Sequence, residues 1–242
     1  MAQWVSHSHT SMLDEMIRLE GRASYTNSFC IECLESWPTL HCDDCFGGEL
    51  FCEGCIIKLH ICNPLHNIKV FSVFLSWISI TSAYWEPQHW NGLYFEAATL
   101  KSLGLCMQLG HHPGHHCVSP KPASGDDFVI IDSHSIHKVG LDYCGCEGAT
   151  VPETQLLHLL LYPVTSMNLK LAATFHVMKQ FHLLSFELKC SGYEFYHSVA
   201  QYMENTGVQP PWVHFKILWS SSGLIHPIGS VWWAYAHCTP VA

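Results

Sequence analysis

Basic residues are scarce in this chain. Lys and Arg together number 11 in 242 residues against 20 Asp and Glu, so the formal net charge at pH 7 is −9. The first 66 residues are especially one-sided, with three basic residues against nine acidic ones. Proteins that hold nucleic acid unaided neutralise its phosphates with Lys and Arg. The charge balance therefore disfavours direct docking of the N-terminal part on DNA.

An apolar signal-peptide core is missing as well, because none occurs in the first sixteen residues. The uncharged run from Val70 to Trp85 has sixteen residues, several of them Ser or Thr. It falls short of the about 20 apolar residues of a membrane-spanning helix, so we interpret it as a buried strand or an atypical insertion. We expect an intracellular protein that is not secreted, has reduced thiols and does not contact a membrane.

Catalytic motifs are absent too. The sequence contains no G-x-S-x-G, phosphate-binding loop or H-E-x-x-H segment. A metal-dependent nuclease would need a carboxylate set such as Asp126, Asp127, Asp132 and Asp142, but nothing in their spacing requires it. We therefore expect no enzymatic activity and no small-molecule substrate, and a nuclease fragment is the least favoured alternative.

Cysteine, in contrast, is abundant, with 13 residues, and its spacing is the most informative feature of the chain. Three C-x2-C couples and one His couple fall within 37 residues: Cys30 and Cys33, Cys42 and Cys45, Cys52 and Cys55, His60 and His66. Two residues between cysteines let one tight turn aim both sulfurs at a single ion, so each couple is half of a tetrahedral site. The eight residues predict two Zn²⁺ ions.

The separations between the couples favour an interleaved pairing. One ion would be held by Cys30, Cys33, Cys52 and Cys55, and the other by Cys42, Cys45, His60 and His66. Sequential pairing would use the same eight residues and stays open. Disulfides are the competing interpretation, but His residues at ligand spacing and the poor geometry of a bridge within a C-x2-C couple favour metal.

A smaller cluster predicts a third metal site with less specificity. Its residues are Cys117, Cys144, Cys146 and His112, the last taken from the His-rich segment LGHHPGHHC. Two expected strands, Asp127 to Asp132 and His137 to Tyr143, would bring the C-x-C couple back beside that segment. Because a C-x-C couple binds zinc less regularly than C-x2-C, free cysteines beside a His-rich loop are the alternative.

The remaining pattern is mainly helical. Helical spacing of apolar residues predicts helices over Ser11 to Arg22, Leu171 to Leu188 and Tyr193 to Asn205, and a short helix begins near Cys52. Together with the expected strands, these elements predict an α+β fold. It consists of a small zinc cross-brace module, comparable to a B-box, followed by a mixed strand and helix region.

Several stretches occur in an order that is typical of one family. They are LDEMIRLEGR, the C-x2-C series to NPLH, WNGLYFEAATLKSLGLCMQLGH, DFVIIDSHSIHKVGLDYCGCE and AATFHVMKQFHLLSFELKCSGYEFYHSVAQYMENTG. These stretches cover most of residues 12–207 and resemble the CxC-type, CxC2-like cysteine cluster domain that accompanies KDZ (Kyakuja, Dileera, Zisupton) transposases of fungi. The resemblance implies the same eight zinc ligands, a later motif at Cys144 and Cys146, and a zinc-chelating accessory module that normally precedes a transposase catalytic region.

Two segments depart from the family pattern, and we interpret both as translated noncoding sequence. The resulting division is 1–29 helix and lead-in, 30–68 cysteine cluster, 69–89 atypical apolar insertion, 90–207 α+β region and 208–242 atypical tail. We predict a nuclear, zinc-binding, non-catalytic module derived from a transposable element that recognises a protein or chromatin partner, such as a transposase. A DNA-binding module that supports the transposase is the alternative.

Overall fold

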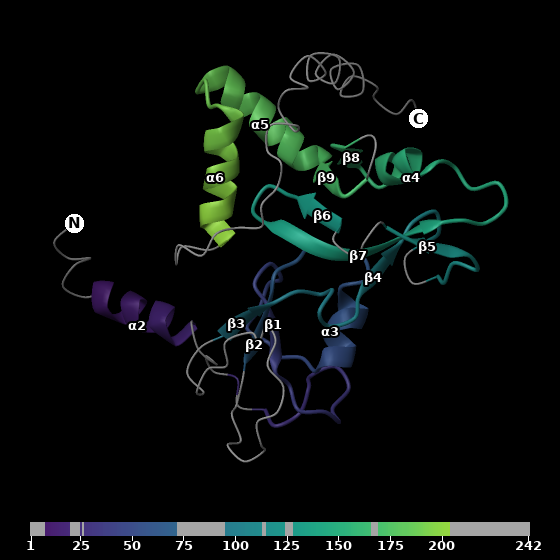
Figure 1. The fold of residues 1–242 in the computed structure, drawn as a ribbon. Coiled ribbons are helices and arrows are strands. Elements are labelled where there is room, and N and C mark those ends of the chain that lie inside the picture. Colours follow the sequence, from purple (N-terminus) through teal and green to yellow (C-terminus); the bar gives the residue numbers. More distant parts are fainter. Residues whose placement is uncertain are drawn as a thin grey trace, which may run out of the picture. The chain divides into compact units, whose positions relative to one another are not determined.

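The computed structural model describes residues 8–19, 25, 27–71, 95–112, 115–123, 128–165 and 169–203. The chain divides into two compact units, one up to Cys106 and one from Met107 onward. Both contain strands and helices, so the predicted α+β class is confirmed (Figure 1). Most of the apolar run Val70 to Trp85, the whole tail 208–242 and the predicted helix end at Asn205 lie outside the described residues. The five-segment division stays a prediction.

A three-stranded antiparallel sheet organises the first unit. Its order is β1 (Leu40–Cys42), β2 (Ile68–Phe71) and β3 (Phe95–Ala98). Cys42 is the register partner of Ile68 on β2, so one predicted zinc ligand ends a sheet strand. The sheet therefore fixes the position of the C-x2-C couple that begins at this residue.

The predicted short helix near Cys52 is confirmed as α3 (Glu53–Leu59), with Cys52 as its N-cap residue. Its Ile56 is fully buried in the core of the first unit. The buried members of that core are Leu40, Cys42, Ile56, Ile68 and Leu100. A cysteine thus takes part in a small apolar core that one helix and one sheet enclose.

The N-terminal helix α2 (His9–Leu19) confirms the expected amphipathic helix but begins two residues before Ser11. Its apolar residues Met12, Leu13, Met16 and Ile17 are all exposed. The predicted end at Arg22 lies outside the described residues.

A larger sheet organises the second unit. Its strands follow the order β4 (Cys106–Gln108), β7 (Ile136–Cys144), β6 (Phe128–Ile131), β9 (Leu171–Thr174) and β8 (Leu161–Pro163), and β5 (Pro120–Pro122) also pairs with β7. The expected pairing of the two central strands is confirmed: β6 and β7 are antiparallel, with Ile131 opposite Ile136. The pairing of β6 with β9 is parallel, so the chain must cross over between these strands.

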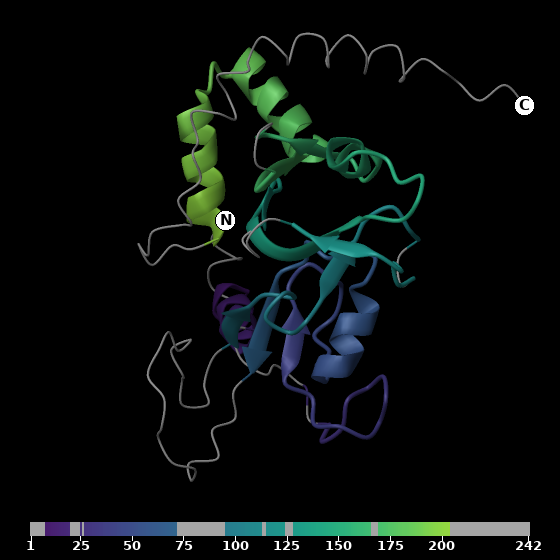
Figure 2. The same ribbon diagram turned by 45° about the vertical axis from the view of Figure 1, so that its right-hand side comes forward.

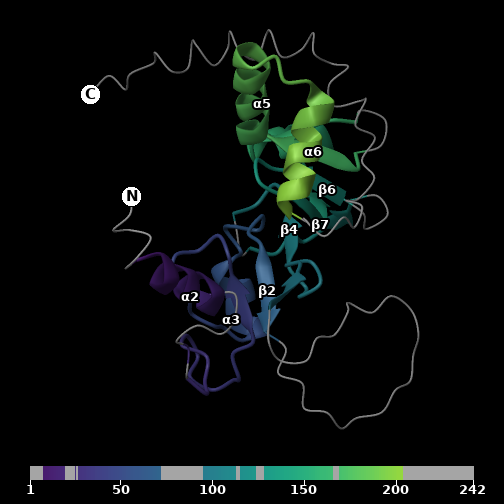
Figure 3. The same cartoon turned by 90° about the vertical axis from the view of Figure 1, so that its left-hand side faces the viewer.

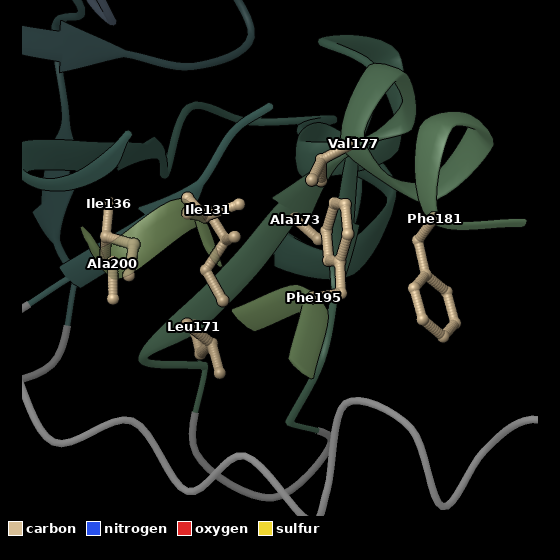
Figure 4. Packing of buried hydrophobic residues seen from close by; sticks show 9 residues of the cluster. Ile131, Ile136, Leu171, Ala173, Val177, Phe181, Phe195 and Ala200 are labelled. Carbon is tan, nitrogen blue, oxygen red and sulfur yellow. The ribbon is translucent and has the colours of Figure 1, made fainter. Parts of the chain in front are cut away.

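The described part of this unit also contains three helices: α4 (Pro152–His158), α5 (Phe175–Glu187) and α6 (Gly192–Met203). Figures 2 and 3 show α5 and α6 beside the sheet. They bury Val177, Phe181, Phe195, Val199 and Ala200 against Ile131, Ile136, Leu171 and Ala173 of the strands, and Figure 4 shows this packing. No cysteine belongs to the buried members of this cluster, and the buried residues Cys117 and Cys144 of the second unit lie outside it.

The prediction of a helix from Leu171 to Leu188 was wrong at its start. Leu171 to Thr174 form the strand β9, all four residues are buried, and strands pair with it on both sides. Burial on two faces overrides local helical spacing here. The helix begins only at Phe175, where the Thr174 side chain accepts a hydrogen bond from the Val177 amide at 3.1 Å and serves as its N-cap.

Candidate metal centres

The first Cys group lies in the first unit. The Sγ atoms of Cys30, Cys33, Cys52 and Cys55 all lie within 4.8 Å of one another. The Sγ atoms of Cys33 and Cys52 are 3.8 Å apart. The first couple comes from a loop before β1 and the second from the N-terminus of α3. This grouping is the interleaved one that we predicted, and the sequential pairing is not the one that the structure brings together.

A closed loop carries the first couple of this group. The Cys30 amide donates to the Ser36 carbonyl at 2.8 Å, and the Leu34 amide donates to the Cys30 carbonyl at 2.8 Å. Backbone amides of Glu35 and Ser36 point at the Cys33 thiol and lower its pKa to about 6, whereas burial raises the pKa of the Cys55 thiol to about 12. The Cys33 thiolate thus forms readily, whereas the buried Cys55 thiol would lose its proton only when a cation compensates for its burial.

The second group combines two cysteines and two histidines. One ligand atom from each of Cys42, Cys45, His60 and His66 lies within 4.8 Å of the others. Nδ1 of His66 lies 3.4 Å from both Cys42 Sγ and Cys45 Sγ, and Nε2 of His60 lies 3.5 Å from Cys45 Sγ. Burial raises the pKa of the Cys42 thiol to about 12. A neutral thiol here would give way to a thiolate only when a cation compensates for its burial.

The orientation of His60 is fixed by a hydrogen bond. Its ring is almost fully buried, and Nδ1 lies 2.8 Å from the carbonyl oxygen of Ile56. A carbonyl oxygen only accepts, so Nδ1 carries the proton and Nε2 presents its lone pair toward Cys45. This is how metal-binding histidines are usually oriented by a second hydrogen bond.

The third group lies in the second unit. One atom from each of His111, Cys117, Cys144 and Cys146 lies within 4.8 Å of the others. Nε2 of His111 is 3.3 Å from Cys144 Sγ and 3.8 Å from Cys146 Sγ, and the two sulfurs of Cys117 and Cys146 are 3.6 Å apart. Side-chain hydrogen bonds lower the pKa of Cys146 to about 6, and their partners are Cys144, His111 and Cys117.

The histidine of this group differs from the one that we predicted. His111 joins the three cysteines, whereas the ring of His112 packs on His115 with their centroids 6.3 Å apart. The reason lies in Gly110, which has a φ of +78° and approaches so closely that a Cβ there would meet the Cys144 Cβ at 2.7 Å. This turn delivers the next residue, His111, to the cysteines.

Two glutamines that we did not predict support the third group. Gln155, buried on α4, accepts from the Cys144 amide at 2.8 Å and donates to the Cys144 carbonyl at 3.0 Å. The side chain of Gln108 accepts from the Cys117 amide at 2.8 Å. Neither residue belongs to a spacing motif, so only the pairing of distant segments reveals their roles.

The distances within the three groups match those expected around zinc. With Zn–S near 2.3 Å and Zn–N near 2.0 Å, a tetrahedron puts two sulfurs about 3.8 Å apart and a sulfur and a nitrogen about 3.5 Å apart. Two of the S···S separations are 3.8 and 3.6 Å, and four of the S···N separations lie between 3.3 and 3.5 Å. A disulfide would need about 2.05 Å, and the described cysteines are free thiols. The three groups can therefore hold metal ions and are consistent with zinc.

Of the carboxylates that we considered for a nuclease, the two that the structure describes, Asp132 and Asp142, do not join these groups. Asp132 accepts a hydrogen bond from Thr174 Oγ1 and thereby ties the end of β6 to the start of α5. Asp142 lies 3.5 Å from the Gln108 amide nitrogen. Asp126 and Asp127 lie outside the described residues. The observed contacts of Asp132 and Asp142 are thus explained by local structure.

No helix within the described residues combines the length and apolar character that would let it cross a membrane. Neither the curated proteins nor the solved structures contain a significant match to the chain. One family model does match: residues 100–207 align with the CxC2-like cysteine cluster associated with KDZ transposases. This segment holds all four residues of the third group. The resemblance is thereby confirmed for this part of the chain, since residues 100–207 are similar to the CxC2-like cysteine cluster associated with KDZ transposases.

Proposed function

We propose that this chain is a non-catalytic zinc-binding module of a KDZ-type transposable element that acts in the nucleus by recognising a protein partner. Three Zn²⁺ ions are bound. Cys30, Cys33, Cys52 and Cys55 hold the first, Cys42, Cys45, His60 and His66 the second, and His111, Cys117, Cys144 and Cys146 the third. The ions are structural, because each has four protein ligands and no open position for a reacting molecule.

The tetrahedral separations within the groups carry this proposal. Three independent sets reach zinc-like separations from segments far apart in sequence: one of four cysteines, one of two cysteines with two histidines, and one of three cysteines with a single histidine. The orientation of His60 and the Gln155 bonds to Cys144 supply the outer contacts that zinc sites usually have. The match to a transposase-associated cysteine cluster supports the assignment to a transposable element.

A protein partner fits the charge better than DNA does. Residues 27–57 contain no Lys or Arg and six acidic residues. The next two basic residues are Lys58 and Lys69, and Lys69 already pairs with Asp43 at 2.9 Å. Phosphates would meet an uncompensated negative surface there, whereas a protein partner with cationic side chains would be attracted to it.

Native mass spectrometry of the reduced full chain tests the metal part of the proposal. We expect three zinc ions per chain, and one fewer in each of Cys33→Ser, Cys42→Ser and Cys144→Ser. Cys62→Ser is the matched control, because Cys62 is exposed and belongs to no group. Retention of all three ions in the three group variants, or a lower count in the control, would contradict the assignment.

DNA binding in support of a transposase remains the second candidate, and a salt titration separates the two. For each phosphate neutralised, DNA affinity should fall by about 0.9 log units per log unit of salt. We expect no such binding to duplex DNA at moderate salt. Specific binding with a steep salt slope would favour the second candidate over a protein partner.

A further inference from the structure

The loop that closes the first metal group exposes an unusual number of apolar side chains. Phe29, Ile31, Leu34 and Trp37 are exposed by 56, 46, 71 and 49%. They fall within nine consecutive residues, and the bond from the Cys30 amide to the Ser36 carbonyl closes this segment on itself. We call residues 29–37 the knuckle surface. Scattered apolar residues are normal on a surface, but a contiguous group marks an interaction site.

The residue at the tip of the knuckle surface has no evident role in folding. Leu34 has a φ of +58°, a left-handed conformation that L-residues with a bulky side chain rarely adopt. Gly or Asn would fit this position with less strain. The Leu34 side chain is 71% exposed, so burial does not offset the cost. Its apolar side chain is therefore free of a role in the core and accessible to another molecule.

Acidic residues alternate with these apolar ones. Glu32 and Glu35 lie in the same loop and are exposed, and Glu53 is exposed in the first turn of α3 beside the second couple of the same metal group. The backbone amides of Glu35 and Ser36 point at the Cys33 thiol, and the Ser36 carbonyl accepts from the Cys30 amide. The side chains of Leu34 and Glu35 are exposed. A partner here meets apolar and negative groups together.

We infer that the knuckle surface is a docking site for a basic peptide segment in which Lys or Arg residues flank large apolar side chains. The apolar side chains would cover Leu34 and its neighbours, and the cations would face Glu32 and Glu35. This inference rests on the proposed function, because zinc at Cys30 and Cys33 holds the loop in shape, and it names the chemistry of the protein partner. Charge complementarity selects this occupant over an acidic or purely apolar one.

Fluorescence anisotropy with the zinc-loaded full chain and labelled synthetic peptides tests the inference. One peptide contains only Lys and Leu, a second has Glu in place of Lys, and a third has Ser in place of Leu. We expect the Lys/Leu peptide to bind at least about tenfold more tightly than either relative. Equal binding of the Lys/Leu and Lys/Ser peptides would show a purely electrostatic contact and overturn the inference.

Two substitutions localise the site. Leu34→Asn should keep the fold, because Asn tolerates a positive φ, and should weaken binding of the Lys/Leu peptide by about tenfold. Leu160→Asn is the matched control: Leu160 also has a φ of +58° and is 58% exposed, but lies in the other unit. An unchanged affinity in Leu34→Asn, or an equal loss in Leu160→Asn, would overturn the assignment.

A zinc count on the same samples separates this inference from the proposed function. Three ions with no preference for the Lys/Leu peptide would refute the docking site and leave the metal assignment standing. Loss of zinc from the wild-type chain would refute both. Tighter peptide binding after Met16→Gln and Ile17→Gln would show that α2 already covers the knuckle surface. That result would contradict the inference that a segment of another molecule occupies it.

Discussion

The two units place their candidate zinc groups differently with respect to their apolar cores. In the first unit, Cys42 is itself a member of a core with five buried residues, and Ile56 of that core accepts from His60. In the second unit, nine buried residues pack between α5, α6 and the strands, and none of them is a cysteine. The third group instead lies at the end of β7, where its buried ligands Cys117 and Cys144 are outside that cluster. We therefore expect zinc to complete the core of the first unit and to matter less for the core of the second.

Removing zinc with a chelator should produce the largest difference in stability between the two units. We expect the first unit to unfold, because metal-binding free energy is folding free energy in so small a core. The Leu40 and Phe51 amides, which bond to each other's carbonyls at 3.0 and 2.8 Å, should lose protection from hydrogen exchange. The Val129 amide, bonded to the Lys170 carbonyl, should keep it.

Hydrogen exchange followed by mass spectrometry measures both regions in one experiment. Equal loss of protection in the segments 40–60 and 171–187 would show that the second unit also depends on zinc for its core. Restored protection after zinc is returned serves as the control for irreversible damage.

Truncating the apolar core of the second unit should produce the next largest effect. Phe195 is 3% exposed and packs on Phe181, with ring centroids 5.3 Å apart. Phe195→Ala should lower the free energy of unfolding by about 3–5 kcal/mol, measured by urea denaturation. Tyr193→Ala, at a position that is 62% exposed, should change it little. Both variants should retain the two ions of the first unit, and loss of these would mean that the cores are coupled.

Gln155→Ala tests how firmly the third group is held. Without this side chain the Cys144 amide and carbonyl lose their partners at 2.8 and 3.0 Å, which should cost about 1–3 kcal/mol. The affinity for the third zinc should fall by about 10–100-fold, measured by competition with a chromophoric chelator. Gln201→Ala on α6 is the exposed control. An unchanged zinc affinity in Gln155→Ala would show that the cysteines hold their geometry alone.

A smaller effect is expected at the start of α6, where Ser191 and Glu194 form a capping box. The Ser191 amide donates to Glu194 Oε2 at 2.8 Å, and the Glu194 amide donates to Ser191 Oγ at 3.3 Å. Ser191→Ala should lower the stability of the second unit by about 1 kcal/mol. Thermal unfolding with zinc in excess measures this, and Ser198→Ala, which lies within α6, is the comparison.

The hydrogen bonds between Ser191 and Glu194 also make the stability of the fold depend on pH. Hydrogen bonds from the Ser191 amide and hydroxyl lower the pKa of Glu194 from its usual 4.5. A lowered folded-state pKa means that the stabilisation is complete above the unfolded value and is lost as the pH falls through the folded value. The stability difference between the wild type and Glu194→Gln should therefore shrink below pH 4.5. A difference that grows on acidification would contradict the assigned bonds.

The smallest expected effect is a gain in stability. Leu34→Asn and Leu160→Asn each relieve a φ of +58°, and each should raise stability by less than about 1 kcal/mol. Because the two sites lie in different units, equal gains would show that backbone strain is independent of the metal environment. A loss at Leu34 alone would indicate that its side chain supports the first metal group.

The spacing of the cysteines predicted the composition of the first two groups because ligands two residues apart must share one turn. It did not distinguish His111 from His112, since that choice depends on a close approach of Gly110 to Cys144 across 34 positions of sequence. The strand β9 was missed for a similar reason. Only its partners β6 and β8 make the segment from Leu171 to Thr174 extended, and local periodicity contains no information about partners.

Gln155 has a further consequence, which concerns the order of assembly. The strands β6 and β9 become parallel neighbours only after β7, α4 and β8 have been laid down between them. By bonding to Cys144 at the end of β7, Gln155 closes the first part of this crossover and shortens the remaining loop. A residue that supports a metal group would thus also favour the pairing of two strands that lie far apart in the chain.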